Sequence, residues 1–231
     1  IIGVDAGSVD PGPYYLGAGV SFTDRAAVKR DLALLLPEAL KRGIPLLIGT
    51  AGGSGAHEHL AWNREIIEEI AAEQNLSFKM AVIPADIDKD HLLANLNKTV
   101  PLGPLPPLTA RDVREATYIV AQMGWEPYKE ALDMGAQVIL GGRTYDPAVF
   151  AALALKLGFP KGPALHMGKI LECAAIAAEP GSGRDCMIGV LDEEGFTLFP
   201  TNPQRRCTVK SVAAHSLYEK SNPWLLPGPG G

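Results

Sequence analysis

The sequence predicts an α/β protein with a Rossmann-like, mainly parallel sheet, flanking helices and a smaller α+β appendage at the carboxyl end. Short apolar runs alternate with helical patterns of 3.6-residue period over residues 1–183. Glycine and proline, 25 and 19 of 231 residues, cluster where the apolar runs stop. After Gly183 the pattern changes to a hairpin. We therefore expect an α/β ligand-binding core over residues 1–183 and a hairpin-plus-helix appendage over residues 184–231.

Composition excludes several classes of protein. The net charge is −5 without a basic stripe, so nucleic acid is not an expected partner. Cys173, Cys186 and Cys207 are too few and too scattered for a disulfide framework or a CxxC zinc site, which favours a reducing cytoplasm. No apolar run approaches the roughly 20 residues that span a bilayer, so no membrane partner is expected. The chain starts within a strand pattern and without Met, and we expect a fragment shortened at both ends.

The first expected strand, residues 1–4, runs into residues 5–13, a segment too rich in glycine and proline to continue it. Asp5, Ser8 and Asp10 leave the strand at this point. Either carboxylate is a candidate for orienting a substrate or exchanging a proton, and the serine is a candidate ligand-binding residue.

Three helix and strand units follow. Thr23 is expected to cap a helix that ends at Gly43, a second buried strand covers residues 44–48, and a third covers residues 78–83. Helices are expected between them, around Trp62, Ile66 and Ile70, and after the third strand over residues 90–97. This order of elements favours a parallel sheet.

The second strand ends in a glycine-rich turn at the start of a helix. Free backbone N–H groups and the helix dipole suit a phosphate or carboxylate there. The candidate ligand-binding residues of the turn are Thr50, Gly52, Gly53, Ser54 and Gly55. A tight turn without a ligand is equally consistent, since neither a P-loop nor a GxGxxG pattern is present.

The remaining elements follow the same rules. A proline-rich loop covers residues 100–107, and a fourth strand covers residues 137–140. Helices are expected over residues 110–122, 127–134, 163–178 and 212–220, and from Asp146 onward; a hairpin joins residues 185–191 to 197–199.

The fourth strand stops at two glycines that allow another backbone or a ligand to come close, and then releases Arg143, Thr144 and Asp146. The guanidinium offers a bidentate fork for a carboxylate or phosphate, and Thr144 adds a hydroxyl donor. The alternative is an Arg143–Asp146 ion pair that closes the loop. Helix capping explains Asp146 nearly as well as catalysis does.

The expected helix over residues 163–178 carries His166, Lys169 and Cys173 on one face. Burial would lower the pKa of both His166 and Lys169 toward the range of a general acid or base. A satisfied histidine and a lysine that reaches solvent are about as consistent. Cys173 lies among alanines, and we interpret it as an inert packed thiol.

Four segments, residues 5–17, 141–153, 164–189 and 211–231 (beginning DAGSVDPGPYYLG, GGRTYDPAVFAAL, ALHMGKILECAAI and SVAAHSLYEKSNP), resemble the acyclic terpene utilisation family of AtuA-like proteins. The resemblance covers nearly the whole chain. It implies a bacterial, cytoplasmic protein of branched-acid or acyl-CoA catabolism, and it assigns no catalytic residues.

The function hypotheses differ in the chemistry of the site. The first is an enzyme for hydration, hydrolysis or a lyase-type step on a small organic acid or its CoA thioester, with His166 and Lys169 as acid and base. The second is a non-catalytic binding or docking subunit of a carboxylase-like complex. The third adds a divalent metal on Asp5, Asp10, Asp86 and Asp146. The expected partners are a small anionic substrate and either a second copy of the chain or a partner subunit.

Overall fold

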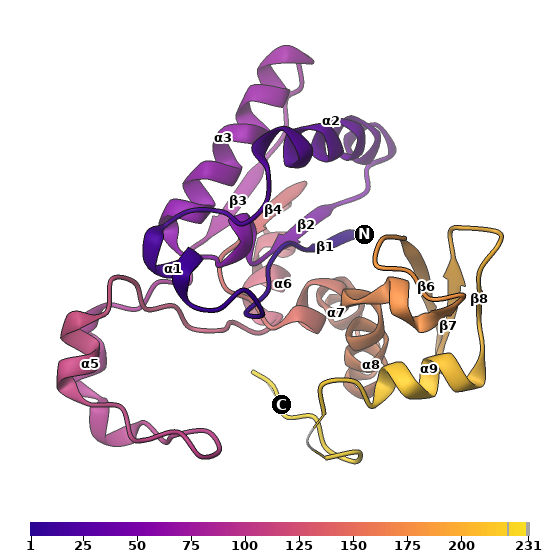
Figure 1. Cartoon of the computed structure of the whole chain (residues 1–231). Helices are drawn as coiled ribbons and strands as arrows, with labels where there is room; N and C mark the ends of the chain where they lie inside the picture. The colour runs from indigo at the N-terminus through magenta and orange to yellow at the C-terminus, as the bar shows by residue number, and fades with distance from the viewer. Residues whose placement is uncertain (221, 230–231) are drawn as a thin grey trace.

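The computed structural model describes residues 1–220 and 222–229 and has a parallel sheet at its centre (Figure 1). Residues 221, 230 and 231, which belong to the predicted appendage, lie outside the described residues. The four strands are ordered β1-β2-β4-β3 and all run in the same direction. Their bounds are Ile2–Asp5, Leu46–Gly49, Val138–Gly141 and Met80–Ile83 in that order. The predicted α/β fold with a mainly parallel sheet is confirmed, and all four carboxyl ends meet at one edge.

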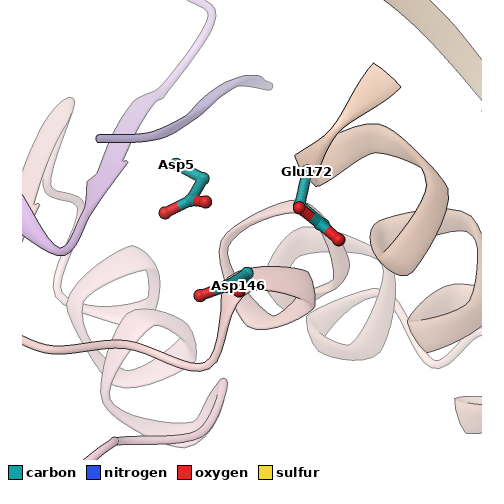
Figure 2. A group of neighbouring side chains, drawn as sticks. All are labelled: Asp5, Asp146 and Glu172. Carbon is teal, nitrogen blue, oxygen red and sulfur yellow. The ribbon is translucent and has the colours of Figure 1, made fainter. Parts of the chain in front are cut away.

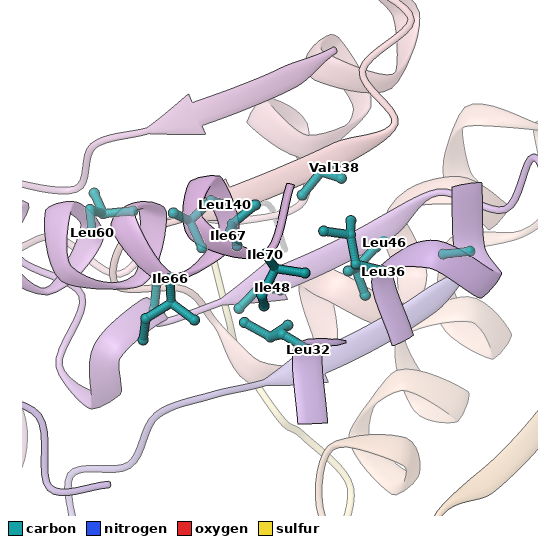
Figure 3. Close-up of a cluster of buried hydrophobic side chains, with 12 residues drawn as sticks. Leu32, Leu36, Leu46, Ile48, Leu60, Ile66, Ile67, Ile70, Val138 and Leu140 are labelled. Atoms are coloured by element: carbon teal, nitrogen blue, oxygen red, sulfur yellow. The ribbon is translucent and has the colours of Figure 1, made fainter. Parts of the chain in front are cut away.

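Two layers of helices cover the sheet. Helices α2 (Arg25–Arg42) and α3 (His57–Glu73) pack on one face, where β2 and β4 present Leu46, Ile48, Val138 and Leu140 (Figure 3). Helices α6 (Glu126–Asp133) and α7 (Asp146–Lys156) cover the other face, where the alternate residues Leu47 and Ile139 point. This alternation is the period-two pattern of a strand buried on both faces.

Helix α2 starts one residue later than the sequence pattern predicts. Its N-cap is Asp24, whose side chain accepts a hydrogen bond from the Ala27 N–H at 3.0 Å, whereas Thr23 bonds to Ser21. The helix ends at Gly43 in the left-handed conformation, as predicted. Short helix α1 (Tyr14–Ala18) was not predicted and lies in the first crossover.

The long connection between β3 and β4 leaves the body of the molecule (Figure 1). It contains α4 (Lys89–Ala94), the 3₁₀ turn η2 (Leu96–Lys98) and α5 (Ala110–Glu115). The helix expected over residues 110–122 stops early because the chain becomes extended at Ala116 and then pairs with the exit of β3, where Val120 bridges Asp86. Tertiary pairing there overrides helical propensity.

The carboxyl-terminal region packs around α8 (Lys161–Glu172). The helix expected over residues 163–178 is divided, because it stops before Cys173, which has φ −115° and ψ 41°, and continues as the 3₁₀ turn η3 (Ala174–Ala177). The predicted hairpin is present as β6 (Met187–Leu191) and β7 (Phe196–Pro200). A second ladder joins β5 (Ala178–Glu179) to β8 (Arg206–Cys207), and α9 (Val209–Ser216) starts earlier than predicted, at a Thr208 capping box.

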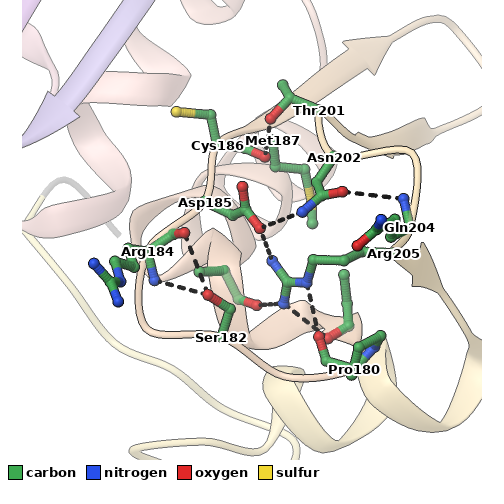
Figure 4. A network of polar contacts seen from close by, with 12 residues as sticks. Pro180, Ser182, Arg184, Asp185, Cys186, Met187, Thr201, Asn202, Gln204 and Arg205 are labelled. Atoms are coloured by element: carbon green, nitrogen blue, oxygen red, sulfur yellow. Dashed lines mark hydrogen bonds and ion pairs between the residues drawn. The ribbon is translucent and has the colours of Figure 1, made fainter.

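Arg205 holds this region together from inside (Figure 4). The side chain is 4% exposed and pairs with Asp185 at 3.0 Å. Its other N–H groups donate to the carbonyls of Pro180, Ala178 and Ala175. One guanidinium thus closes the loop between β5 and β6 onto the end of η3.

None of the helices in the two described stretches combines the length and the apolar character that crossing a membrane requires.

Candidate active site

Three carboxylates converge at the carboxyl edge of the sheet (Figure 2). Asp5 is the last residue of β1, Asp146 the first of α7 and Glu172 the last of α8. One oxygen from each lies within 4.8 Å of the others, and all three residues are half-buried. Packing of α8 against α7 brings Glu172 to the two aspartates. We call these three residues the acid cluster.

Like charge and burial act together on the acid cluster. Burial, and then the neighbouring charge of Asp146, raise the pKa of Asp5 to about 8, against a 3.4 Å hydrogen bond from the Gly7 N–H and the charge of Arg143. Burial also raises the pKa of Asp146, which Arg143 lowers and Glu172 raises. Asp5 therefore carries a proton at neutral pH.

Lys169 compensates only part of this charge. Its ammonium group contacts Glu172 at 2.5 Å and Glu219 at 2.9 Å. Burial lowers the pKa of Lys169, but the hydrogen bonds to these two carboxylates outweigh it and raise the pKa above its ordinary value. The expectation of a lowered Lys169 pKa was therefore wrong, because the sequence did not place two acids beside it. Lys169 is a fixed cation.

The charges at this site do not balance. Four carboxylates, those of the acid cluster and of Glu219, face two cations, Lys169 and Arg143, which leaves an excess of two negative charges when all are ionised. Carboxylate oxygens at this spacing are the ligands that hard divalent cations prefer. The acid cluster is therefore where the described residues can hold such a cation.

Arg143 lies next to the acid cluster but faces a separate cavity. Ser8, Ser54 and Gln122 line this cavity of about 520 Å³ together with Arg143. Among the ion pairs of the described residues none includes Arg143, so the alternative Arg143–Asp146 pair is not formed. A half-buried guanidinium without a carboxylate partner, next to two serine hydroxyls, can bind the carboxylate or phosphate of a ligand.

Two predicted ligand-binding threonines are used inside the protein. Thr50 and Thr144 are fully buried, and the Thr144 N–H donates to Thr50 Oγ1 at 3.1 Å. The Thr144 hydroxyl donates to the Gly142 carbonyl at 2.8 Å, so the Tyr128 hydroxyl, 2.6 Å away, is the donor to Thr144 Oγ1. These hydrogen bonds join the segment that follows β4 to the segment that follows β2. They thereby fix the backbone position of Arg143.

The glycine turn after β2 is filled by backbone. Gly53 and Gly55 donate their N–H groups to Thr50 and Ala51 inside the turn. Gly55 has φ +75°, and a Cβ there would lie 2.2 Å from the Arg143 nitrogen, whose N–H donates to the Gly55 carbonyl at 3.1 Å. Another backbone thus makes the close approach that the glycines at the end of β4 were expected to allow, and Gly52 lines a different cavity, described below.

Several predicted site residues lie away from the acid cluster. Asp10 is exposed, and Asp86 accepts from His57 Nδ1 at 2.9 Å. His166 Nε2 contacts the Ser216 hydroxyl at 3.0 Å, and burial lowers the pKa of His166 as predicted. Cys173, in contrast, directly follows Glu172 of the acid cluster, and burial together with that carboxylate raises the pKa of its thiol to about 12, consistent with an inert thiol. The structure thus joins Asp5 to Asp146, and Ser8 to Ser54 and Arg143.

Glu172 and Glu219 were missed by the sequence reasoning. Glu172 follows Lys169 by three residues, a spacing that indicates an ion pair on a helix. No local pattern shows that the end of this helix meets a strand 167 residues earlier in the chain.

Comparison with known proteins yields one match. The model of the family described as Acyclic terpene utilisation family protein AtuA matches residues 24–227. Neither the curated proteins nor the solved structures that were compared give a match.

Proposed function

Since the chain belongs to the acyclic terpene utilisation family, with its catabolic role, we propose that it is an enzyme for a small organic acid or its CoA thioester. The observation that carries this proposal is the acid cluster beside Arg143. A proton donor, a proton acceptor and an anion-binding group within one site are what a hydratase or lyase requires. The family match supports the catabolic setting, and the residues support the reaction class.

Arg143 is the anchor for the substrate. A carboxylate or phosphate in the cavity between Ser8 and Ser54 would meet the Arg143 guanidinium, which is the cation that the described residues place there, and the serine hydroxyls supply further donors. The Arg143 guanidinium is close enough to Asp5 and Asp146 for its charge to lower the pKa of both carboxyl groups. A substrate bound to this guanidinium is therefore held next to both carboxyl groups. Positioning of this kind accounts for a large share of catalytic power.

Asp5 and Asp146 divide the proton chemistry between them. Asp5, with its pKa of about 8, holds a proton that it can donate at neutral pH. Asp146 is the group of the pair that Arg143 favours in its ionised form, and it serves as the base. In a lyase-type or dehydration step the base removes a proton from the substrate while the acid protonates the leaving oxygen or the developing carbanion.

The excess negative charge supports a second form of the same function. Asp5, Asp146 and Glu172 are the residues that would hold a divalent cation, which would keep all three carboxylates ionised and would supply Lewis-acid polarisation of a substrate oxygen. The two forms differ in one measurable property, which is stabilisation of the protein by a divalent cation alone.

The test is a thermal-shift and turnover screen of CoA thioesters and dicarboxylates against the protein and two variants. Arg143→Ala is expected to weaken binding of the acid by about 10- to 100-fold, because a charged hydrogen-bonded contact is lost. Asp5→Asn is expected to reduce turnover by about 100-fold or more while the acid still binds.

The matched control is Arg111→Ala, which removes an exposed guanidinium paired only with Glu115 on α5. It should change neither binding nor turnover. Unchanged binding and turnover in both Arg143→Ala and Asp5→Asn would show that the acid cluster is not the active site.

A further inference from the structure

A second cavity lies beside Asp5, one member of the acid cluster. It encloses about 360 Å³ between the end of β1 and helices α2 and α3, and Asp5 is part of its wall. Apolar side chains such as Phe22, Val28, Leu32 and Ile48 form most of the lining. This volume and this lining are typical of a site for a small, mainly apolar ligand.

One buried polar group in this wall lacks a partner. Asn63 on α3 is 3% exposed and lines the cavity, and its Oδ1 atom has no hydrogen-bond partner among the described residues. Its neighbours on the same helix face are core residues, including Leu60, Ile66 and Ile67. A buried amide oxygen without a hydrogen bond destabilises a protein, and the apolar packing here would favour leucine. Stability alone therefore gives no reason for asparagine at this position.

Among the described residues, a cationic side chain lines one of the two cavities and acidic side chains line the other. Asp5 and Asp31 line the apolar cavity, and no lysine, arginine or histidine of the described residues does. Arg143 lines the other cavity, and Ser8 lines both. An acid with a hydrocarbon chain would therefore bind in one direction only, with its anionic end at Arg143 and its uncharged end between α2 and α3.

We propose that the cavity between α2 and α3 binds the uncharged hydrocarbon end of the substrate, and that Asn63 Oδ1 accepts a hydrogen bond from a hydroxyl group on that chain. The χ2 torsion of asparagine has a broad energy profile, so the carboxamide can turn toward this hydroxyl at little cost. The inference rests on the proposed function in one respect, that the reacting end lies at Asp5. The substrate class is then a hydroxylated, medium-chain branched or linear acid.

Two isomeric probes isolate the role of Asn63. 1-Octanol donates a hydrogen bond, whereas heptyl methyl ether has the same atoms and can only accept one. Calorimetric titration of the parent protein should show octanol binding about tenfold tighter, the ratio expected for one net hydrogen bond to a buried acceptor. In Asn63→Leu this preference should disappear, and the melting temperature of the ligand-free variant should rise.

A matched pair of variants on α2 tests the location. Val28→Phe fills the cavity and should weaken binding of both probes at least tenfold. Leu34→Phe enlarges a side chain that is 68% exposed on the same helix and should change neither affinity. Ligand-free melting temperatures of both variants identify a loss of fold as the cause of any failure.

Equal affinity for the two probes in the parent, a preference that survives Asn63→Leu, or absence of binding at millimolar concentration would each overturn the inference. Octanol carries no acid group, so its binding should persist in Arg143→Ala. If the probes behave as expected while Arg143→Ala leaves acid binding and turnover intact, the proposed function fails and the apolar site stands. If the probes do not behave as expected while Arg143→Ala weakens binding of the acid, the apolar site is refuted and the proposed function stands.

Discussion

Two clusters of buried charge in this protein are built in opposite ways. Around Arg205 every partner complements the cation, because Asp185 supplies the negative charge and three carbonyls accept its remaining N–H groups. Around Asp5 the neighbours repeat its charge, and Asp146 and Glu172 lie within 4.8 Å of it. The first cluster closes a loop with matched donors and acceptors. The second retains a repulsion that contributes nothing to folding, and such sites are commonly functional.

The largest effect is expected from breaking the satisfied cluster. Arg205→Ala removes the cation that pairs with Asp185 and the donor to the carbonyls of Pro180, Ala178 and Ala175, and it should lower the free energy of unfolding by about 4 kcal/mol. Urea denaturation measures this loss. Arg206→Ala, at the exposed neighbouring position, is the control and should change the stability by less than about 0.5 kcal/mol. Similar values for both variants would contradict the structural role of Arg205.

The opposite change is expected at the acid cluster. Because the pKa of Asp5 in the folded protein, about 8, lies above its ordinary value, the folded state retains a proton that the unfolded chain releases. Stability should therefore fall as the pH rises from about 4 to about 8. Asp5→Asn cannot ionise, so at pH 8 it should be more stable than the parent by about 3 kcal/mol, allowing for solvent at the site, and nearly equal at pH 4.

Melting curves from pH 4 to pH 8 measure this difference. Asp10→Asn removes an exposed carboxylate in the same loop and should reproduce the parent curve. The explanation fails if Asp5→Asn shows the same loss of stability with pH as the parent.

A somewhat smaller effect should come from cations. If the excess charge of the acid cluster binds Mg²⁺, Mn²⁺ or Ca²⁺, a concentration 100 times the dissociation constant raises the free energy of unfolding by about 2.7 kcal/mol. The apparent affinity should weaken about tenfold for each pH unit below 8, because the Asp5 proton competes with the cation. Thermal shifts at pH 8 and pH 6 check this. Glu172→Gln should reduce the shift, and absence of any shift in the parent leaves the cation-free form of the mechanism.

Much of the fold is encoded in local patterns. The four strands were predicted because short apolar runs are followed by glycine, proline or aspartate, and helices α2, α3 and α7 because their apolar residues recur with helical period. Errors arose where a contact distant in sequence decides the structure. Val120 is extended because it pairs with Asp86, and α8 ends at Glu172 although alanine-rich sequence follows it.

The part of the site that could be predicted from the sequence is the part that lies at the ends of the parallel strands. Asp5, Ser8 and Arg143 follow strands whose ends meet at one edge, so the sequence places them near one another. Glu172 belongs to a helix outside the sheet, and only packing against α7 brings it there. Thr50 and Thr144 also follow strands, but they are buried and hydrogen-bonded to each other, so a position at a strand end does not by itself make a residue available to a ligand. Asn63 could not be predicted as a site residue, because asparagine on a helix is usually exposed and its burial is known only from the structure.

The position of α8 has a consequence for how the site is held together. Asp5 and Asp146 come from the sheet and from the helix that follows β4, whereas the third carboxylate reaches them through the packing of α8 on α7. The repulsion within the acid cluster therefore acts across this one contact between two helices. A substitution that loosens the contact would move Glu172 away from the two aspartates without touching the pairing of the four parallel strands.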